Sequence, residues 1–405
     1  MSPQLLEKLT TEFGTPLYVY NAAIIRARIL ELKTELGQYS DTEILYAVKA
    51  NYNPHLVQLI VENGCGVDAV SPEEALIGLV AGAKPEQIMF TENNATDAEI
   101  DVVMSKNILV NAGSLSRLEK IGTKYPGSKV CVRFNPNVGA ASHSTNITGG
   151  PDSKFGISYA EIDKVKNIVT KYNLQVVGVH EHIGSGWLGL DEPLLALDMI
   201  LDIAKQFPDL EFVDVGGGVG VPYRPDQTRL DLKVLGARMA EKFSAFCQTY
   251  GRNLKLRFEP GRYIVAEGGQ LIARVNTLKQ KMNGKNVIGV DTGMNHLIRP
   301  ALYDSYHPIV NLSNPTGTEQ IYDVTGNICE SADYFAKDRA LPEVREGDLI
   351  SFEIAGAYGQ AMASTYQFRA KPAEILVEGD QISLIRPRET FASLLAAYPD
   401  FKPTV

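Results

Sequence analysis

The stretch EILYAVKANYNPHLVQLIVENGCGVDAV, residues 43–70, contains one complete unit of the pattern that decides the fold. An apolar run rich in strand-forming residues (43–50) leads through an Asn-Pro turn into a segment with apolar residues at i, i+3 and i+4 (54–64). A second short strand follows at 66–70. A strand, a helix and a strand in this order predict parallel strands joined by a crossover helix.

The same unit recurs as far as residue 260. Eight such units in about 220 residues fit a closed (β/α)₈ TIM-type barrel better than an open doubly wound sheet, which stays the alternative. The expected strands are 43–50, 66–70, 87–91, 108–112, 129–135, 175–183, 211–216 and 255–260.

The pattern changes after EPGR (259–262). Strand-like runs follow at 269–282, 286–293, 348–356 and 373–386, with little helix before TFASLLAAY. They predict a second, mostly β domain of barrel or sandwich type. The isolated strand PLYVYN (16–21) is expected to pair with that domain. We therefore expect a barrel over 22–262 and a β domain built from 1–21 and 263–405.

Composition narrows the classes of function. A net charge of −9 argues against nucleic acid or an anionic membrane as the main partner, and no apolar run approaches the length of a membrane span. The N-terminus lacks the apolar core of a secretion signal. Four widely spaced cysteines without a CxxC pair suggest reduced thiols, so we expect a cytoplasmic protein.

Four features mark the ends of the predicted strands. Lys49 ends the first, where it is either a nucleophilic amine or a structural lysine that bonds loop carbonyls. Gly216, Gly217 and Gly218 follow the seventh strand, a position that often holds a phosphate in such barrels. Glu259 and Arg262 follow the eighth strand. Either Glu259 is an acid in the barrel mouth, or the two residues are surface charges that flank a Pro-Gly turn.

The sixth strand ends in HEHIGSG (180–186). Period-two alternation places His180 and His182 on one face, but no matching acidic or histidine cluster accompanies them, so we expect no metal. A flat imidazole against a flat cofactor ring is the better use of this pair. A lysine, a phosphate loop, an acid and a stacking histidine together indicate pyridoxal phosphate, with Glu259 at the pyridine nitrogen.

With these motifs the chain resembles the fold-type-III, alanine-racemase-like pyridoxal-phosphate decarboxylases, and within them the diaminopimelate decarboxylases. The resemblance covers nearly the whole chain in order. It rests on YAVKAN (46–51), NPNVG (135–139), TGGPDSKFGI (148–157), HIGSG (182–186), GGG (216–218), EPGR (259–262), IRPALYDSYH (298–307), CESADYFAKD (329–338) and AGAYGQAMASTYQFR (355–369).

The resemblance implies a role for each matching residue. Lys49 matches the Schiff-base lysine, His182 the ring-stacking histidine, Glu259 the acid at the pyridine nitrogen and Cys329 the candidate proton donor. Phosphate and cofactor contacts are implied for Ser185, Gly216, Gly217, Gly218, Gly261, Arg262 and Tyr358. Substrate contacts are implied for Arg262, Arg299, Tyr303, Glu330 and Tyr358. His296 and His307, which flank IRPALY, receive no role.

The implied reaction is decarboxylation of meso-2,6-diaminopimelate to L-lysine and CO₂ in a homodimer, with Cys329 and Glu330 reaching the partner's site. Arg262 and Arg299 suit the carboxylate at the far end of that substrate, and Glu330 suits its ammonium. The rivals are a decarboxylase of D-lysine, D-ornithine or a carboxyamine such as carboxynorspermidine, a racemase on a similar barrel, and a non-catalytic cofactor-binding protein. Departures from the family pattern fall at Pro72, Glu73 and Ala332, and Trp187 follows the cofactor serine's motif.

Overall fold

The structure is a computed structural model that describes residues 1–135, 137, 149, 150 and 152–401. The chain separates into two compact units. One comprises Met1–Ile25, Tyr223–Gln227 and Val265–Val405, and the other comprises Arg26–Pro222 and Thr228–Ile264. Each unit is described by itself below.

The second of these units is a closed barrel of eight parallel strands, as the sequence predicts. The hydrogen-bonded order is β5-β4-β3-β2-β10-β9-β8-β6, and pairing of β5 with β6 closes it. The barrel strands are β2 (Thr42–Ala47), β3 (Gly66–Ala69), β4 (Ile88–Thr91), β5 (Leu109–Ala112), β6 (Lys129–Asn135), β8 (Gln175–His180), β9 (Phe212–Asp214) and β10 (Lys255–Phe258). The two-residue strand β7 (Ile157–Ser158) adds to β6.

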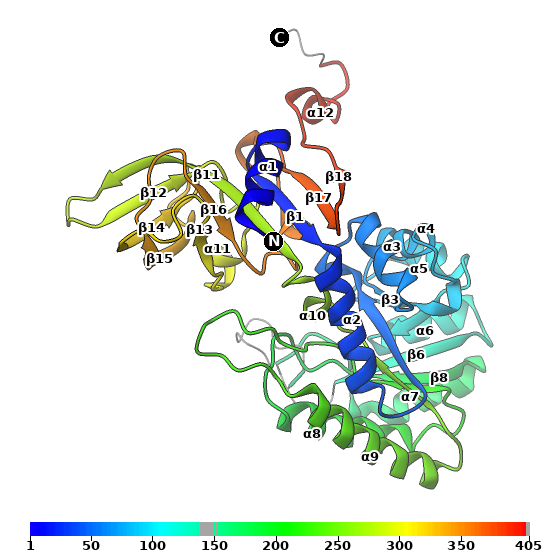
Figure 1. Ribbon diagram of the computed structural model, residues 1–405. Helices are drawn as coiled ribbons and strands as arrows, with labels where there is room; N and C mark the ends of the chain where they lie inside the picture. The colour runs from blue at the N-terminus through cyan, green and yellow to red at the C-terminus, as the bar shows by residue number, and fades with distance from the viewer. Residues whose placement is uncertain (136, 138–148, 151, 402–405) are drawn as a thin grey trace. The chain divides into compact units, whose positions relative to one another are not determined.

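Helices cover the outside of the barrel, as α8 and α9 show in Figure 1. The helices are α2 (Ala22–Leu36), α3 (Pro54–Glu62), α4 (Pro72–Val80), α5 (Asp97–Met104), α6 (Leu115–Lys124), α7 (Ile162–Tyr172), α8 (Asp191–Ala204), α9 (Leu232–Tyr250) and α10 (Arg262–Val265). Several begin at a side chain that accepts a backbone N–H, such as Asn53, Ser71 and Thr96. The strand interiors are apolar, since Leu45, Met89, Cys131, Val177 and Phe212 form one buried cluster.

The other unit is a separate β-sheet domain. Its main path runs β15-β14-β12-β11-β1-β17-β18, with β16 on β11 and β13 on β16. The strands are β1 (Leu17–Asn21), β11 (Gly269–Gln280), β12 (Asn286–Val290), β13 (Ile309–Asn311), β14 (Glu319–Thr325), β15 (Tyr334–Pro342), β16 (Leu349–Phe352), β17 (Ala373–Glu378) and β18 (Gln381–Arg386). The helices are α1 (Pro3–Phe13), α11 (Arg299–Tyr303) and α12 (Phe391–Leu395).

The expected pairing of the N-terminal strand is confirmed, because β1 runs antiparallel to β11 and parallel to β17. Leu17 and Val19 of β1 enter the core of this unit with Ile272 and Ile375. Strands β13, β14 and β15 have no counterpart in the sequence prediction. Most positions of β14 and β15 are exposed or half-buried, so their sequences lack the apolar alternation that would reveal them.

No helix in the described part of the chain is both long enough and apolar enough to cross a membrane.

Candidate active site

Lys49 lies just beyond the first barrel strand rather than at its end, because β2 stops at Ala47 and a single 3₁₀ turn (Val48–Ala50) follows. The two neighbours of Lys49 in that turn are buried, whereas its own side chain is 38% exposed. Its Nζ lies 3.4 Å from Oδ2 of Asp68, a fully buried carboxylate on β3. The amine is therefore held beside an anion and is still open to a ligand.

The glycine run forms a loop that only glycine allows. Gly216 and Gly218 have φ values of +65° and +103°, which disfavour any side chain. A Cβ on Gly217 would lie 2.0 Å from the backbone oxygen of Glu259. Asp214, at the end of β9, accepts a hydrogen bond from the backbone nitrogen of Gly216 at 2.8 Å. The loop is thus packed closely against the turn after β10, with its amides near the barrel mouth.

His182 belongs to the loop after β8, because that strand ends at His180. The prediction that His180 and His182 share one strand face is therefore wrong, because only His180 is on the strand. The backbone nitrogen of Gly217 donates to His182 Nδ1 at 3.2 Å, so the ring proton sits on Nε2. Burial lowers the pKa of His182 well below its usual value, which keeps the imidazole neutral and suited to stacking.

Glu259 is buried at the end of β10 and pairs with a residue the sequence left without a role. Its Oε2 lies 3.0 Å from Nε2 of His180, and both side chains are almost fully buried. Burial raises the pKa of Glu259 well above its usual value. Its second oxygen, Oε1, has no hydrogen-bond partner among the described residues. An orphaned buried carboxylate oxygen is costly unless a ligand supplies a donor.

Arg262 follows in the same turn and donates from Nη2 to the hydroxyl of Ser185 at 3.0 Å. Gly261 allows the turn to approach β2, since a Cβ there would lie 2.9 Å from the backbone oxygen of Ala47. This packing brings the ends of β2, β8 and β10 together. Two of the phosphate contacts implied by the resemblance, Arg262 and Ser185, therefore bond to each other.

Arg133, the inward-facing arginine of KVCVRFN near the end of β6, is a site residue that the sequence did not single out. Its side chain is buried, and its guanidinium carbon lies 4.8 Å from the centroid of the Phe155 ring. It lines a cavity of about 360 Å³ that includes Ser114 and Lys154. Alternation along the strand could have revealed it, because Arg133 interrupts an otherwise apolar run.

In the β-sheet unit, Arg299 is buried at the start of α11 and is held by two aromatic neighbours. His307 Nδ1 donates to the backbone oxygen of Glu353 at 2.9 Å, so its Nε2 carries the lone pair that accepts from Arg299 Nη1 at 3.0 Å. The Arg299 guanidinium carbon also lies 4.7 Å from the centroid of the Tyr223 ring. Tyr303 ends the same short helix and is half-buried.

Cys329 and Glu330 lie on an exposed loop of the same unit. Buried Asp333 shapes this loop, since its carboxylate accepts from the backbone nitrogens of Ile328 and Met294, both at 2.7 Å. Tyr358 lies on a separate loop with a φ of +57°, a strained value for a residue with a side chain. Strain of this kind is often kept at binding sites.

The departures from the family pattern are accommodated locally. Pro72 takes the first position of α4, where its missing N–H costs nothing, and Ser71 caps the helix by accepting from Glu74 at 3.1 Å. Ala332 is not among the described residues with a positive φ, so a Cβ there causes no backbone strain. The Trp187 ring lies against Gly218, because a Cβ at that glycine would be 2.4 Å from the indole nitrogen. Much of NPNVG and the start of TGGPDSKFGI lie outside the described residues.

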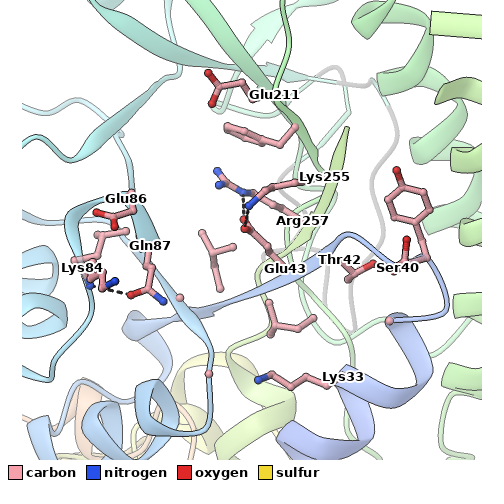
Figure 2. Close-up of a pocket in the computed structure, with 18 residues that line it drawn as sticks. Lys33, Ser40, Thr42, Glu43, Lys84, Glu86, Gln87, Glu211, Lys255 and Arg257 are labelled. Atoms are coloured by element: carbon pink, nitrogen blue, oxygen red, sulfur yellow. Dashed lines mark hydrogen bonds and ion pairs between the residues drawn. The ribbon is translucent and has the colours of Figure 1, made fainter. Parts of the chain in front are cut away.

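The barrel unit also has a cavity of about 770 Å³ at the opposite end, where β2, β3, β4, β9 and β10 begin. Figure 2 shows Glu43 in this cavity bonded to both Lys255 and Arg257. Glu211, on its rim, pairs with Lys129 at 2.5 Å. These charges neutralise one another, so we interpret the cavity as structural rather than catalytic.

The barrel residues fit pyridoxal phosphate. The aldehyde requires an accessible amine, the phosphate requires backbone donors without side chains, and the protonated ring nitrogen requires a buried acceptor. Lys49 and Oε1 of Glu259 meet the first and third needs. The Gly216–Gly218 loop suits the second at Gly218, because the amides of Gly216 and Gly217 already donate to Asp214 and His182. His180, Asp214 and Glu259 also offer donor atoms within 4.8 Å of one another, a spacing that could suit a metal; the expectation of no metal stays a prediction.

Comparison with known proteins identifies the family. A family model described as "Pyridoxal-dependent decarboxylase, pyridoxal binding domain" matches residues 22–266. The chain is 40% identical to a diaminopimelate decarboxylase of Methanothermobacter thermautotrophicus over 397 residues, which cover 96% of this chain and 92% of the relative.

Solved structures support the same family. Diaminopimelate decarboxylase from Helicobacter pylori in complex with L-lysine is 36% identical, with a TM-score of 0.89 and coverage of 97% of this chain and 98% of that one. A lysine/ornithine decarboxylase from Vibrio vulnificus bound to putrescine has a TM-score of 0.81 but only 22% identity, over 93% of this chain and 98% of that one, which shows the shared fold alone. The chain belongs to the diaminopimelate decarboxylases, within the family of pyridoxal-dependent decarboxylases.

Proposed function

We propose that the protein is a carboxy-lyase that uses pyridoxal phosphate to convert meso-2,6-diaminopimelate into L-lysine and CO₂, the last step of lysine biosynthesis. One structural observation carries the proposal. The amine of Lys49, the side-chain-free Gly216–Gly218 loop and the orphaned oxygen of Glu259 all occupy the carboxyl ends of strands in one barrel.

Most of the residues proposed to hold the cofactor lie within 22–262. Lys49 would bind its aldehyde and His182 would pack against its flat ring. The phosphate would be held at the side-chain-free loop of Gly216, Gly217 and Gly218, at Gly261, and by the side chains of Ser185, Arg262 and Tyr358. Glu259 would keep a proton on the pyridine nitrogen. Bound pyridoxal phosphate supplies an electron-accepting ring that takes up the electron pair left when CO₂ departs.

The remaining residues, 1–21 and 263–405, would recognise the far end of the substrate. Arg299, with Arg262, Tyr303 and Tyr358, suits its carboxylate, and Glu330 suits its ammonium. His307 and the Tyr223 ring hold the Arg299 guanidinium, which reduces the freedom it loses on binding. Removing one partner from such a charged pair costs about 2–5 kcal/mol, because the other charge is left unpaired.

We also propose a cytoplasmic homodimer in which Cys329 and Glu330 complete the active site of the second copy. Both residues are exposed in the single chain, and Cys329 would return a proton to the carbon that loses CO₂. The loop that carries them is ordered from within its own unit by Asp333. The loop can therefore be presented to a second chain without refolding.

The test is made on purified protein with pyridoxal phosphate. It is incubated separately with meso-diaminopimelate, L-lysine, D-lysine, D-ornithine and carboxynorspermidine, and CO₂ and product chirality are followed. The visible absorbance band of lysine-bound cofactor should disappear in Lys49→Ala. It should persist in Lys84→Ala, which removes a lysine from the cavity at the opposite end of the barrel.

We expect CO₂ and L-lysine from the meso acid alone. Turnover of only D-lysine, D-ornithine or carboxynorspermidine would keep the cofactor chemistry and refute the substrate. Loss of substrate chirality without release of CO₂ would point to a racemase. Loss of the absorbance band in both lysine variants would refute the assignment of Lys49.

A further inference from the structure

Three buried ionisable side chains meet at the carboxyl ends of three adjacent strands, and the proposed chemistry uses only one of them. His180 ends β8, Asp214 ends β9 and Glu259 follows β10. His180 and Asp214 are directly opposite each other in the β8–β9 ladder. Buried ionisable groups are rarely kept unless they are paired or have a function, so His180 and Asp214 need an explanation.

Asp214 and His180 have different hydrogen-bond partners. Asp214 binds the glycine loop through the backbone nitrogen of Gly216, and the backbone nitrogen of Glu259 donates to the oxygen of the same glycine at 2.8 Å. His180 makes its hydrogen bond to Oε2 of Glu259 alone, and its Nδ1 has no partner among the described residues. Of the two, only His180 acts directly on the acid.

We propose that His180 is a positioning residue that determines which oxygen of Glu259 faces the bound pyridine nitrogen and in which protonation state. This inference rests on the proposed function, because it concerns the acid at the cofactor's ring. It assigns a role to the first histidine of HEHIGSG, which the sequence left without one.

The effect of His180 depends on which atom of the His180–Glu259 pair carries the proton of their hydrogen bond. A neutral imidazole has one N–H and one lone pair. If Nε2 carries the proton, it donates to Oε2 of ionised Glu259, and if Glu259 is protonated on Oε2, it donates to Nε2. In both arrangements Oε1 is free of a proton and is an acceptor, so the ring nitrogen facing it supplies the proton of the hydrogen bond. A third arrangement, with Glu259 protonated on Oε1 while Nε2 donates to Oε2, would leave the ring nitrogen unprotonated, and its absence is part of the inference.

Without His180, nothing determines which oxygen of Glu259 carries a proton. A protonated Glu259 could carry its proton on either oxygen and could donate from Oε1 to an unprotonated pyridine nitrogen. The ring would then withdraw electrons more weakly, and decarboxylation would slow. Burial lowers the pKa of His180 to about 4, so the imidazole is neutral at neutral pH, as this role requires.

The surrounding charges are compatible with this arrangement. Burial raises the pKa of Asp214 to about 8, which keeps that carboxyl largely uncharged near Glu259 at neutral pH. The ionisable groups that act on His180 or Glu259 come from the neighbouring strands. They are Lys49 after β2, Asp68 on β3, Arg133 on β6, Asp214 on β9 and Arg257 on β10.

The experiment compares two substitutions in the full-length protein loaded with ¹⁵N-labelled pyridoxal phosphate. His180→Leu removes both ring nitrogens, and His180→Gln keeps an amide that can donate to Oε2. The ¹⁵N chemical shift of the ring nitrogen, recorded between pH 6 and 8, reports directly whether that nitrogen is protonated. Cofactor affinity, kcat, KM and the thermal midpoint are measured on the same samples.

We expect the wild-type protein and His180→Gln to keep a protonated ring nitrogen. His180→Leu should lose it within this pH range, with kcat lowered about 10- to 100-fold, the effect of one hydrogen bond to a charged group, and KM little changed. The matched control is His296→Leu, which removes another buried histidine, bonded to Thr292 and the oxygen of Ala370, from the other unit. It should alter the thermal midpoint alone.

Each outcome is decisive. A protonated ring nitrogen in His180→Leu, with wild-type kcat, would overturn the inference and leave the proposed function intact. Failure of the wild-type protein to bind the cofactor or release CO₂ would instead refute the proposed function. If His180→Leu does not fold, His180→Asn replaces it, because its shorter amide does not reach Glu259. The same shift of the ring nitrogen is then expected.

Discussion

Replacing His307 with phenylalanine tests how far the hydrogen bond between His307 and Arg299 supports substrate recognition. Phenylalanine keeps a ring of similar size, and with it the edge-to-face contact with Tyr223 at 5.4 Å. It removes the lone pair that accepts from Arg299 and the N–H that binds the backbone oxygen of Glu353. The guanidinium then loses one of the contacts that fix its direction.

The size of the effect follows from the type of bond lost. A hydrogen bond to a charged group contributes about 1.5–3 kcal/mol, and about 1.4 kcal/mol corresponds to a factor of ten. We therefore expect KM for meso-diaminopimelate to rise roughly 10- to 100-fold. Because Arg299 would bind the non-reacting end equally in the ground and transition states, kcat should change little.

Steady-state kinetics on His307→Phe and His307→Gln provide the assay. The glutamine variant keeps an acceptor for Arg299 and should recover much of the loss in KM. His55→Phe, a change at an exposed histidine in the barrel unit, serves as the control for general effects of the substitution. An unchanged KM, or a fall in kcat at constant KM, would refute the view that His307 orients a substrate-binding arginine.

Two further outcomes are expected. Gly217→Ala should weaken cofactor binding by at least tenfold, because the new Cβ would lie 2.0 Å from the backbone oxygen of Glu259. In the control, Gly289→Ala, the nearest atom to the new Cβ is 3.6 Å away, so the cofactor should bind normally. Equal affinities of the two variants, measured by equilibrium dialysis, would contradict this. For His296, burial lowers the pKa from 6.5 to about 4, so the unfolded state binds the extra proton and folding stability falls as the pH drops from about 6.5 to 4. Urea unfolding of the cofactor-free protein should show a smaller loss over this window in His296→Leu than in wild type, and parallel curves would argue against it.

Several features of this protein were determined by the sequence alone. Alternation of β-branched runs with amphipathic segments is a local property, so it predicted all eight barrel strands and the pairing of PLYVYN with the second unit. Motif order then indicated the cofactor and the reaction. Local patterns were weaker at β14 and β15, because exposed strands carry mixed polarity that matches no simple period.

Only the tertiary structure decided how the site residues are paired. His180 meets Glu259 across 79 positions of the chain, and Arg262 meets Ser185 across 77. His307 is close to Arg299 in sequence, yet its tautomer is set by the oxygen of Glu353, 46 positions away. Hydrogen bonds require donor and acceptor within about 3 Å, and such distances between remote residues are fixed by barrel closure and loop packing rather than by any sequence period.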